Sequence, residues 1–222
     1  MYGPADMIQR GLRSPTKVVD YLTHRYRDYR AGDRITFDHD RISITNSYPD
    51  FSRELFDDVM TLERAIEVES VNRSLEIGCG YGRLTPWLAR YSESHHAIEP
   101  EADLIETARA LYPEVAFECS SAQELPYEPS EFDLVVSFEV LQHVPDDQLP
   151  NVISEIERVA EEDAVIALYE RISGAANART FVRSPEGYES RFSTYSLEDV
   201  VIERSPQAFH DEHSEYAFLI FR

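Results

Sequence analysis

The stretch LEIGCGYGRLT, residues 75–85, constrains the fold more than any other part of this chain. A short apolar run leads into Gly78, Gly80 and Gly82, and the sequence then resumes with the spacing of a helix. Glycine at these positions can adopt positive φ, and it lets a ligand approach the backbone with no Cβ in the way. The order of strand, tight loop and helix start is that of a nucleotide-binding α/β unit.

Two carboxylates accompany this loop. Glu76 lies in the expected strand just before the first glycine, and Glu99 closes the next apolar run. A carboxylate at the end of the second strand of such a unit is placed to accept hydrogen bonds from both ribose hydroxyls. The loop and the two acids together indicate a nucleotide-type ligand.

On these residues the chain resembles the class I S-adenosylmethionine-dependent methyltransferases. The first motif of that family is an acidic residue followed by glycines at alternate positions, matched here by Glu76, Gly78, Gly80 and Gly82. The dinucleotide fingerprint has its third glycine one position later, where this chain has Arg83, so a nicotinamide or flavin cofactor fits less well. The resemblance extends from about residue 71 to about residue 168 and implies S-adenosylmethionine as the cofactor.

Strands and helices alternate regularly from Arg73 onward, which predicts an α/β fold with a doubly wound, mostly parallel sheet. Strands are expected at 73–77, 95–98, 115–119, 132–138 and 164–169, with helices at 81–91, 101–111 and 147–160. Beyond Arg171 we expect a loop over 171–194, at most a short helix over 196–200, and two closing strands near 201–209 and 216–221. The resemblance implies a Rossmann-like fold whose last strand is antiparallel.

Residues 1–70 are expected to form an N-terminal helical extension, followed by the cofactor-binding domain at 71–222. Ser14 and Pro15 begin a basic amphipathic helix, and residues 35–45 alternate as in a hairpin or extended arm. A second helix, opened by Ser52, carries an apolar face made of Leu55, Val59, Leu62 and Ile66. In the family this region commonly caps the cofactor and contributes to substrate choice.

The resemblance also implies the cofactor-binding residues. Glu76 and the loop of Gly78, Cys79, Gly80 and Gly82 would line the methionine part, and Glu99, with Pro100 beside it, would hold the ribose. The adenine side would be formed by the loop containing Ser121, Ala122 and Gln123, with Ser121 where the family often has aspartate. Phe138, at the end of the fourth strand, completes the set. Cys79 is expected to act as a small filler without thiol chemistry.

The stretch SFEVLQHVP, residues 137–145, is similar to the S-x-E-V-L-E-H-V motif of small-molecule methyltransferases. The implied catalytic residues are Glu139 and His143. His143 is a candidate general base for a hydroxyl acceptor, because imidazole titrates near physiological pH; the alternative is that it hydrogen-bonds backbone and orders the turn. Relatives that bind a divalent cation use Glu-x-x-Glu-His, and Gln142 replaces the second acid here, so no metal is expected.

The formal net charge is −21, from 42 acidic and 21 basic residues, and Lys17 is the only lysine. Such a surface repels itself at low salt, whereas molar salt shortens the Debye length to about 3 Å. We therefore predict a cytoplasmic protein of a halophile, and a nucleic-acid partner is not expected because phosphate binding depends on basic patches. Residues 1–34 are net basic whereas the remainder of the chain is strongly acidic, so the first helix either packs with its arginines in water or faces an anionic ligand or a membrane surface. We find no run of eighteen apolar residues and no leader-like segment.

Four arginines, Arg171, Arg179, Arg183 and Arg191, fall in the irregular segment after the fifth strand. In a chain this acidic they suggest a site for a carboxylate or phosphate on the acceptor, such as a sugar acid or a phosphorylated or lipid-linked sugar. The alternative is that they pair with Glu186 and Glu189 on the surface.

These observations favour methyl transfer from S-adenosylmethionine to a small-molecule or sugar-type acceptor, at oxygen. A first alternative is an inactive S-adenosylmethionine-binding module with a regulatory or partner role. A second is a nucleic-acid methyltransferase, although residues 137–140 read SFEV where the amino-methylating families often have Asn/Asp-Pro-Pro-aromatic. A third, an oxidoreductase, would require nicotinamide binding.

Overall fold

The computed structural model describes residues 58–59, 62, 65–66, 70–175, 180–203 and 214–222. The features expected within residues 1–57, namely the basic helix and the extended arm, lie outside this set. The same holds for Arg179.

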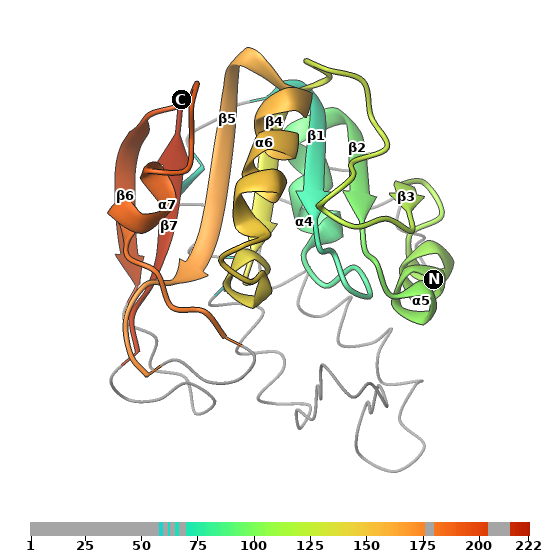
Figure 1. Ribbon diagram of the computed structural model, residues 1–222. Helices are drawn as coiled ribbons and strands as arrows, with labels where there is room; N and C mark the ends of the chain where they lie inside the picture. The colour runs from blue at the N-terminus through green and yellow to red at the C-terminus, as the bar shows by residue number, and fades with distance from the viewer. Residues whose placement is uncertain (1–57, 60–61, 63–64, 67–69, 176–179, 204–213) are drawn as a thin grey trace.

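Seven strands form one sheet in the order β3-β2-β1-β4-β5-β7-β6 (Figure 1). The first five strands are parallel and comprise β1 (Val71–Ile77), β2 (Ser92–Ile98), β3 (Ala116–Glu118), β4 (Phe132–Phe138) and β5 (Ala160–Arg171). Strand β7 (Tyr216–Phe221) is antiparallel to both of its neighbours, β5 and β6 (Leu197–Glu203). The predicted α/β fold, with a doubly wound, mostly parallel sheet and an antiparallel last strand, is confirmed.

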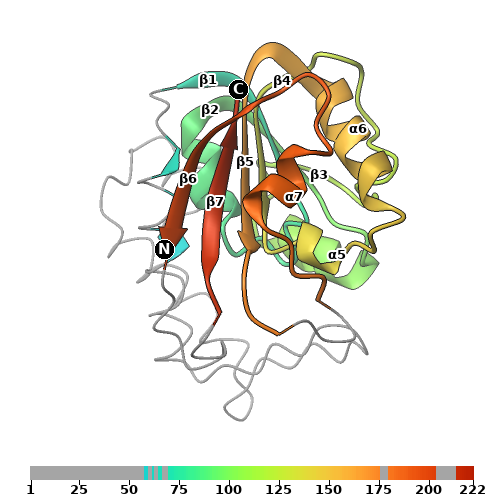
Figure 2. The same ribbon diagram turned by 60° about the vertical axis from the view of Figure 1, so that its left-hand side comes forward.

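Helices cover both faces of the sheet, so the central strands are buried on each side (Figures 1 and 2). One face packs against α6 (Leu149–Val159) and the short α7 (Pro185–Glu189). The other packs against α4 (Thr85–Leu88), the 3-10 turn η1 (Ala89–Tyr91) and α5 (Ala102–Leu111). Three expected members of the second N-terminal helix face, Val59, Leu62 and Ile66, are buried in this second core.

Helix α4 is shorter than the expected helix over 81–91. Pro86 lies in its first turn, and proline is tolerated only there because it lacks an N–H. Residues 81–84 therefore form a turn that continues the glycine loop, and the chain after Leu88 tightens into η1. The prediction of one continuous helix from residue 81 was wrong.

The segment after β5 also differs from expectation. Residues 197–203 form strand β6 and not a short helix, because they pair along the fully buried β7. Helix α7 interrupts the expected loop. Its N-cap is Ser184, whose side chain accepts a hydrogen bond from Gly187 N, and Pro185 is its first residue. Strand β5 extends beyond its predicted bounds at both ends.

The loops that follow β1, β2, β4 and β5 lie together at the lower edge of the sheet in Figure 1. In a parallel doubly wound sheet, this carboxyl edge is where ligands bind. Among the residues that the structure describes, no helix has the length and apolar character needed to cross a membrane.

Candidate active site

The glycine loop after β1 is fastened to the end of β2. The backbone N–H groups of Gly78 and Cys79 both donate to the carbonyl of Ile98, each at 2.9 Å, and Gly82 N donates to Cys79 O at 2.9 Å. These bonds fold residues 78–82 into a tight turn at the carboxyl edge. The turn stands beside Glu99, the residue that follows Ile98.

Two glycines of the loop serve different purposes. Gly78 has φ +72°, and an added Cβ would lie 2.4 Å from Cγ2 of Val140, so the turn after β4 packs directly on its backbone. Gly80 has φ +56°, and an added Cβ would meet nothing within 4 Å. The open side of the loop is therefore at Gly80, where a ligand can approach the main chain.

Glu76 is buried at the end of β1, and its carboxylate faces other side chains. Its Oε2 accepts a hydrogen bond from Thr85 Oγ1 at 2.5 Å and lies 3.4 Å from His95 Nε2. His95 Nδ1 is in turn 2.7 Å from Ser74 Oγ. Glu76 thereby ties the first residue of α4 to the end of β1, which fixes the direction in which the glycine loop leaves the strand.

Glu99 follows β2 and is buried, and its carboxylate is shared between two backbone donors. Oε2 accepts from Gly80 N at 3.0 Å, and Oε1 accepts from Glu101 N at 3.1 Å. Burial raises the pKa of this carboxyl group, and the two backbone N–H donors oppose that shift. The structure thus brings Glu99 and the open glycine of the loop together.

The residues predicted to bind the adenine, in the loop after β3, are more exposed than Glu76 and Glu99. Ser121 Oγ accepts from Gln123 N at 3.2 Å, so this hydroxyl stabilises a turn. The Gln123 side chain donates to the Gln148 side chain, just before α6. The backbone carbonyl of Gln123 accepts from the Asn151 side chain at 2.8 Å. Ala122 is half-buried and Pro100 is exposed on the neighbouring loop. The Gln123 amide is therefore engaged with α6 rather than with the glycine loop.

The turn after β4 carries the two predicted catalytic residues. Glu139 has a left-handed backbone, φ +57°, which is uncommon outside glycine, and its N–H donates to Tyr169 O at 2.7 Å. His143 lies at the end of a 3-10 turn, η2 (Leu141–His143), and its side chain is exposed. Phe138 is buried directly before them and stacks on Tyr169, with ring centroids 4.2 Å apart.

Gln142 has a structural role that explains the amide at this position. Its Oε1 accepts from Arg171 N at 3.1 Å, and its own carbonyl accepts from Phe181 N at 2.7 Å. The side chain is buried and directed toward the end of β5. Within the described part of the chain, no group of three or more His, Cys, Asp or Glu side chains is arranged to hold a metal ion.

Glu170, which was not singled out from the sequence, is the most deeply buried acid at this edge. It closes β5 and accepts hydrogen bonds from Leu141 N at 2.9 Å and Gln142 N at 2.8 Å. Burial raises its pKa to about 8, and the backbone donors reduce that shift. The sequence did contain a signal for Glu170. In the stretch ALYER, residues 167–171, an acidic residue follows an apolar run, much as Glu76 and Glu99 lie near the ends of theirs.

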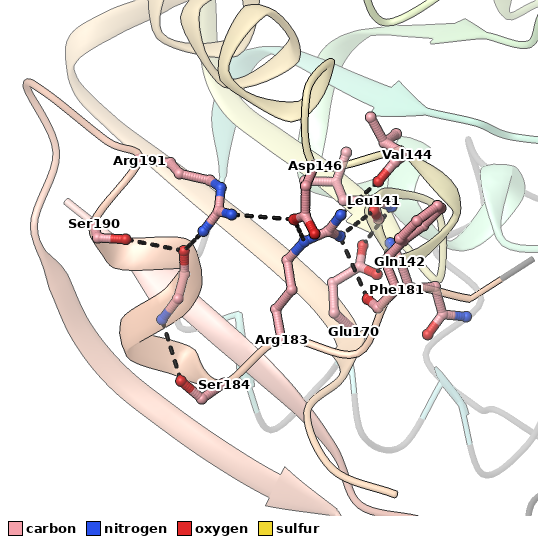
Figure 3. A network of polar contacts seen from close by, with 11 residues as sticks. Leu141, Gln142, Val144, Asp146, Glu170, Phe181, Arg183, Ser184, Ser190 and Arg191 are labelled. Atoms are coloured by element: carbon pink, nitrogen blue, oxygen red, sulfur yellow. Dashed lines mark hydrogen bonds and ion pairs between the residues drawn. The ribbon is translucent and has the colours of Figure 1, made fainter. Parts of the chain in front are cut away.

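The described arginines of the segment after β5 are engaged with the protein itself (Figure 3). Arg183 and Arg191 both pair with Asp146, at 2.8 and 3.1 Å, and Arg183 lowers the pKa of that carboxyl. Arg171 donates to Ser173 O at 3.1 Å and to the Ser214 hydroxyl. The expected partners of Arg183 and Arg191, Glu186 and Glu189, are thus replaced by Asp146.

Cys79 is buried within the glycine loop, and burial, with the charges of Glu76 and Glu99, raises the pKa of its thiol far above the usual range. A thiol held neutral is a poor nucleophile, so it packs as a small apolar side chain.

The geometry of this edge fits a nucleoside cofactor with an attached amino acid chain. Of the three loop glycines, Gly80 is the one at which an added Cβ would meet no atom of the described residues within 4 Å, and Glu99 is held beside it. The turn after β4 packs on the other side of the same loop, through Val140.

Comparison with known proteins agrees with this geometry. The family profile described as "Methyltransferase domain" matches residues 75–168. The methyltransferase GfsG of Streptomyces halstedii is 26% identical over 148 residues, which are 63% of this chain and 52% of GfsG. A ubiquinone biosynthesis O-methyltransferase of Methylococcus capsulatus is 38% identical over 79 residues, 33% of each protein. The chain thus spans about half, or less, of the length of these relatives.

Solved structures show the same fold. A SAM-dependent methyltransferase of Leishmania major superposes with a TM-score of 0.64 at 15% identity, covering 98% of this chain and 90% of that protein. The matched profile begins in β1 and ends in β5, so it contains the glycine loop, Glu99 and the turn after β4. The match of residues 75–168 to the methyltransferase profile, together with the sheet order, shows that this part of the chain is similar to the S-adenosylmethionine-dependent methyltransferases.

Proposed function

We propose that this protein transfers the methyl group of S-adenosylmethionine to an oxygen atom of a small-molecule acceptor, with Glu139 and His143 at the reacting end of the site. The observation that carries the proposal is the contact of the turn after β4 with the glycine loop. Gly78 has no side chain, and Val140 occupies the place where one would be. Glu139 and His143 flank Val140 on the same turn, so both stand beside the methyl donor's loop.

The cofactor supplies a methyl group already activated by its sulfonium. The residues of the chain need to bind the cofactor, orient the acceptor in line with the methyl group and accept a proton from the acceptor. Glu99 and the backbone at Gly80 would hold the cofactor, in keeping with the open main chain there. His143 is exposed at the end of its turn, where its imidazole can take the hydroxyl proton of an acceptor.

An uncharged hydroxyl acceptor is favoured over an anionic one. Arg183 is buried and donates to Asp146 and to the backbone carbonyls of Leu141, Phe181 and Val144, and Arg191 shares the same aspartate. Binding an acceptor carboxylate through these arginines would require breaking those pairs. A sugar-type or phenolic hydroxyl needs no such rearrangement.

Oxygen as the accepting atom is supported by the similarity to the ubiquinone biosynthesis O-methyltransferase, which is 38% identical over 79 residues. The cytoplasmic location and the halophilic origin stay proposals based on the acidic composition. The role of residues 1–70 as a helical cap also stays a proposal.

The test is a transfer assay with S-adenosylmethionine labelled in its methyl group and a panel of phenols, sugars, carboxylic acids and amines. The proposal expects label in a hydroxyl-bearing acceptor together with an equimolar amount of S-adenosylhomocysteine. Label found only in amines would contradict the oxygen assignment. Tight cofactor binding without transfer to any member of the panel would favour the inactive binding module.

A further inference from the structure

The turn of residues 139–146, called here the catalytic turn, is bound by Glu170. This carboxylate has no exposed surface and lies at the end of β5. Its two oxygens accept from two successive backbone N–H groups, Oε1 from Leu141 and Oε2 from Gln142, and Ser137 Oγ lies 3.5 Å from Oε1. A buried acid that uses both oxygens on adjacent main-chain donors fixes the position and the rotation of those peptide units.

Arg183 also binds the catalytic turn (Figure 3). Its Nη1 donates to Leu141 O at 3.0 Å, its Nη2 to Val144 O at 2.6 Å, and its Nε to Asp146 Oδ1 at 2.8 Å. Only 7% of this residue is exposed. The planar guanidinium therefore holds three points of the turn in one fixed arrangement, which a lysine ammonium group cannot reproduce.

The two groups act on the same peptide units. At Leu141 the N–H is bound by Glu170 and the carbonyl by Arg183. At Gln142 the N–H is bound by Glu170 and the carbonyl by Phe181 N, two residues before Arg183. Within the turn itself, His143 N donates to Val140 O and Val144 N to Leu141 O. The N–H groups of Leu141 and Gln142 are instead bound by Glu170, which is far away in the sequence.

Burying two ionisable side chains is costly, and packed apolar residues would often stabilise a protein as well or better. Glu170 and Arg183 do not pair with each other through the bonds described above; each is directed at the main chain of the turn. Their common feature is the geometry that they impose on residues 141–144. His143 lies within this segment and Glu139 lies two residues before it, so the positions of both depend on its conformation.

We infer that Glu170 and Arg183 are positioning residues for methyl transfer, which hold the main chain of the catalytic turn so that Glu139 and His143 keep a fixed geometry toward the methyl donor. The inference rests on the proposed function of that turn. It assigns to the segment after β5 a direct influence on the reaction, although its arginines are not placed to bind the acceptor.

The chain offers a matched control for Glu170. Glu157, on α6, also accepts two successive backbone N–H groups, from Ser193 at 2.8 Å and Thr194 at 2.6 Å, and a serine hydroxyl at 2.8 Å. It is half-buried and holds a different loop. Glu170→Gln and Glu157→Gln therefore remove the same kind of carboxylate, and only the first acts on the catalytic turn.

The experiment compares wild type, Glu170→Gln, Arg183→Lys and Glu157→Gln in three measurements. These are deuterium exchange of a peptide containing residues 139–146, the dissociation constant of S-adenosylmethionine by calorimetry, and turnover with the acceptor found in the transfer assay. For Glu170→Gln and Arg183→Lys we expect exchange and turnover each to change by at least about tenfold, since small misplacements of reacting groups have large kinetic effects. The cofactor dissociation constant should stay within about twofold, and Glu157→Gln should match wild type.

A double variant separates positioning from simple destabilisation. If Glu170 acts through the turn, Glu170→Gln added to His143→Ala should lower turnover little beyond His143→Ala alone, because groups that act as a unit are not additive. Fully multiplicative losses, or unchanged exchange in residues 139–146, would overturn the inference. The exchange measurement needs no acceptor, so failure of the proposed function and failure of the positioning role are read separately.

Discussion

Gly78 and Val140 are in direct contact, so the methyl-donor loop and the catalytic turn form one packed unit. An added Cβ on Gly78 would lie 2.4 Å from Cγ2 of Val140, well inside any real contact distance. The backbone at Gly78 also has φ +72°, which residues with a side chain rarely adopt. Gly80 shares the positive φ, so it is the contact with Val140 that makes Gly78 the less tolerant of the two positions.

Gly78→Ala should therefore lower the free energy of unfolding by roughly 2–4 kcal/mol, from backbone strain and overpacking together. Gly80→Ala has similar strain but open space around the new methyl group, so its stability loss should be about 1–2 kcal/mol. Its larger effect should be on cofactor affinity, because the methyl group would occupy the approach to the main chain. Urea unfolding and calorimetric titration of S-adenosylmethionine measure the two effects. Equal stability losses for the two variants would show that the contact with Val140 does not matter.

Glu99→Gln should weaken S-adenosylmethionine binding by roughly 10- to 100-fold. The carboxylate is buried and held by Gly80 N and Glu101 N, and hydrogen bonds to a charged group are worth about 1.5–3 kcal/mol. Glu118→Gln, at the exposed end of the neighbouring strand β3, is the control and should leave affinity unchanged. Indistinguishable dissociation constants for Glu99→Gln and wild type would remove Glu99 from the cofactor site.

The burial of Glu170 predicts a pH dependence of stability. Its pKa in the folded protein is raised to about 8, by burial and in part by the charge of Glu139, whereas an unfolded glutamate titrates near 4.3. Because the folded pKa is the higher one, the contribution of Glu170 to stability is fully present below about pH 4 and is lost as the pH rises toward 8. Relative to Glu170→Gln, wild type should lose on the order of a few kcal/mol of unfolding free energy between about pH 5 and pH 9. Parallel pH curves for the two proteins would contradict this, and Glu157→Gln serves as the reference.

The net charge of −21 predicts that the protein is more stable in concentrated salt. At molar ionic strength the Debye length falls to about 3 Å, which screens the repulsion between surface carboxylates. The melting temperature should therefore rise from low to multimolar KCl, and a sucrose series of equal osmolality controls for solute exclusion. The same melting temperature in both salt conditions would argue against a halophilic protein.

The bounds of a strand or helix were predicted best from the sequence where the local pattern of apolar residues matches their burial in the structure. Strand β4 has its predicted bounds, Phe132–Phe138, because a strand buried on both faces is an uninterrupted apolar run. The glycine loop and the turn after β4 were placed correctly at strand ends. Helix α4 was mispredicted because the effect of Pro86 in the first turn was overlooked, and β6 because its conformation depends on pairing with β7.

The roles of Glu170 and Arg183 could not be read from the sequence for a different reason. Glu170 contacts the catalytic turn across 28 and 29 positions, and Arg183 reaches Asp146 across 37. Local patterns carry no information on such pairs. The sequence therefore predicted candidate cofactor-binding residues at the strand ends, while the long-range contacts of Glu170 and Arg183 required the structure.

The most direct test of the account is turnover of His143→Ala, measured with cofactor affinity on the same preparation. His143 is exposed on a turn that packs on the donor loop, so its removal should affect proton transfer and leave cofactor binding intact. The account predicts a turnover lower by roughly 10²-fold or more, with an unchanged dissociation constant for S-adenosylmethionine. Turnover equal to that of wild type would contradict it.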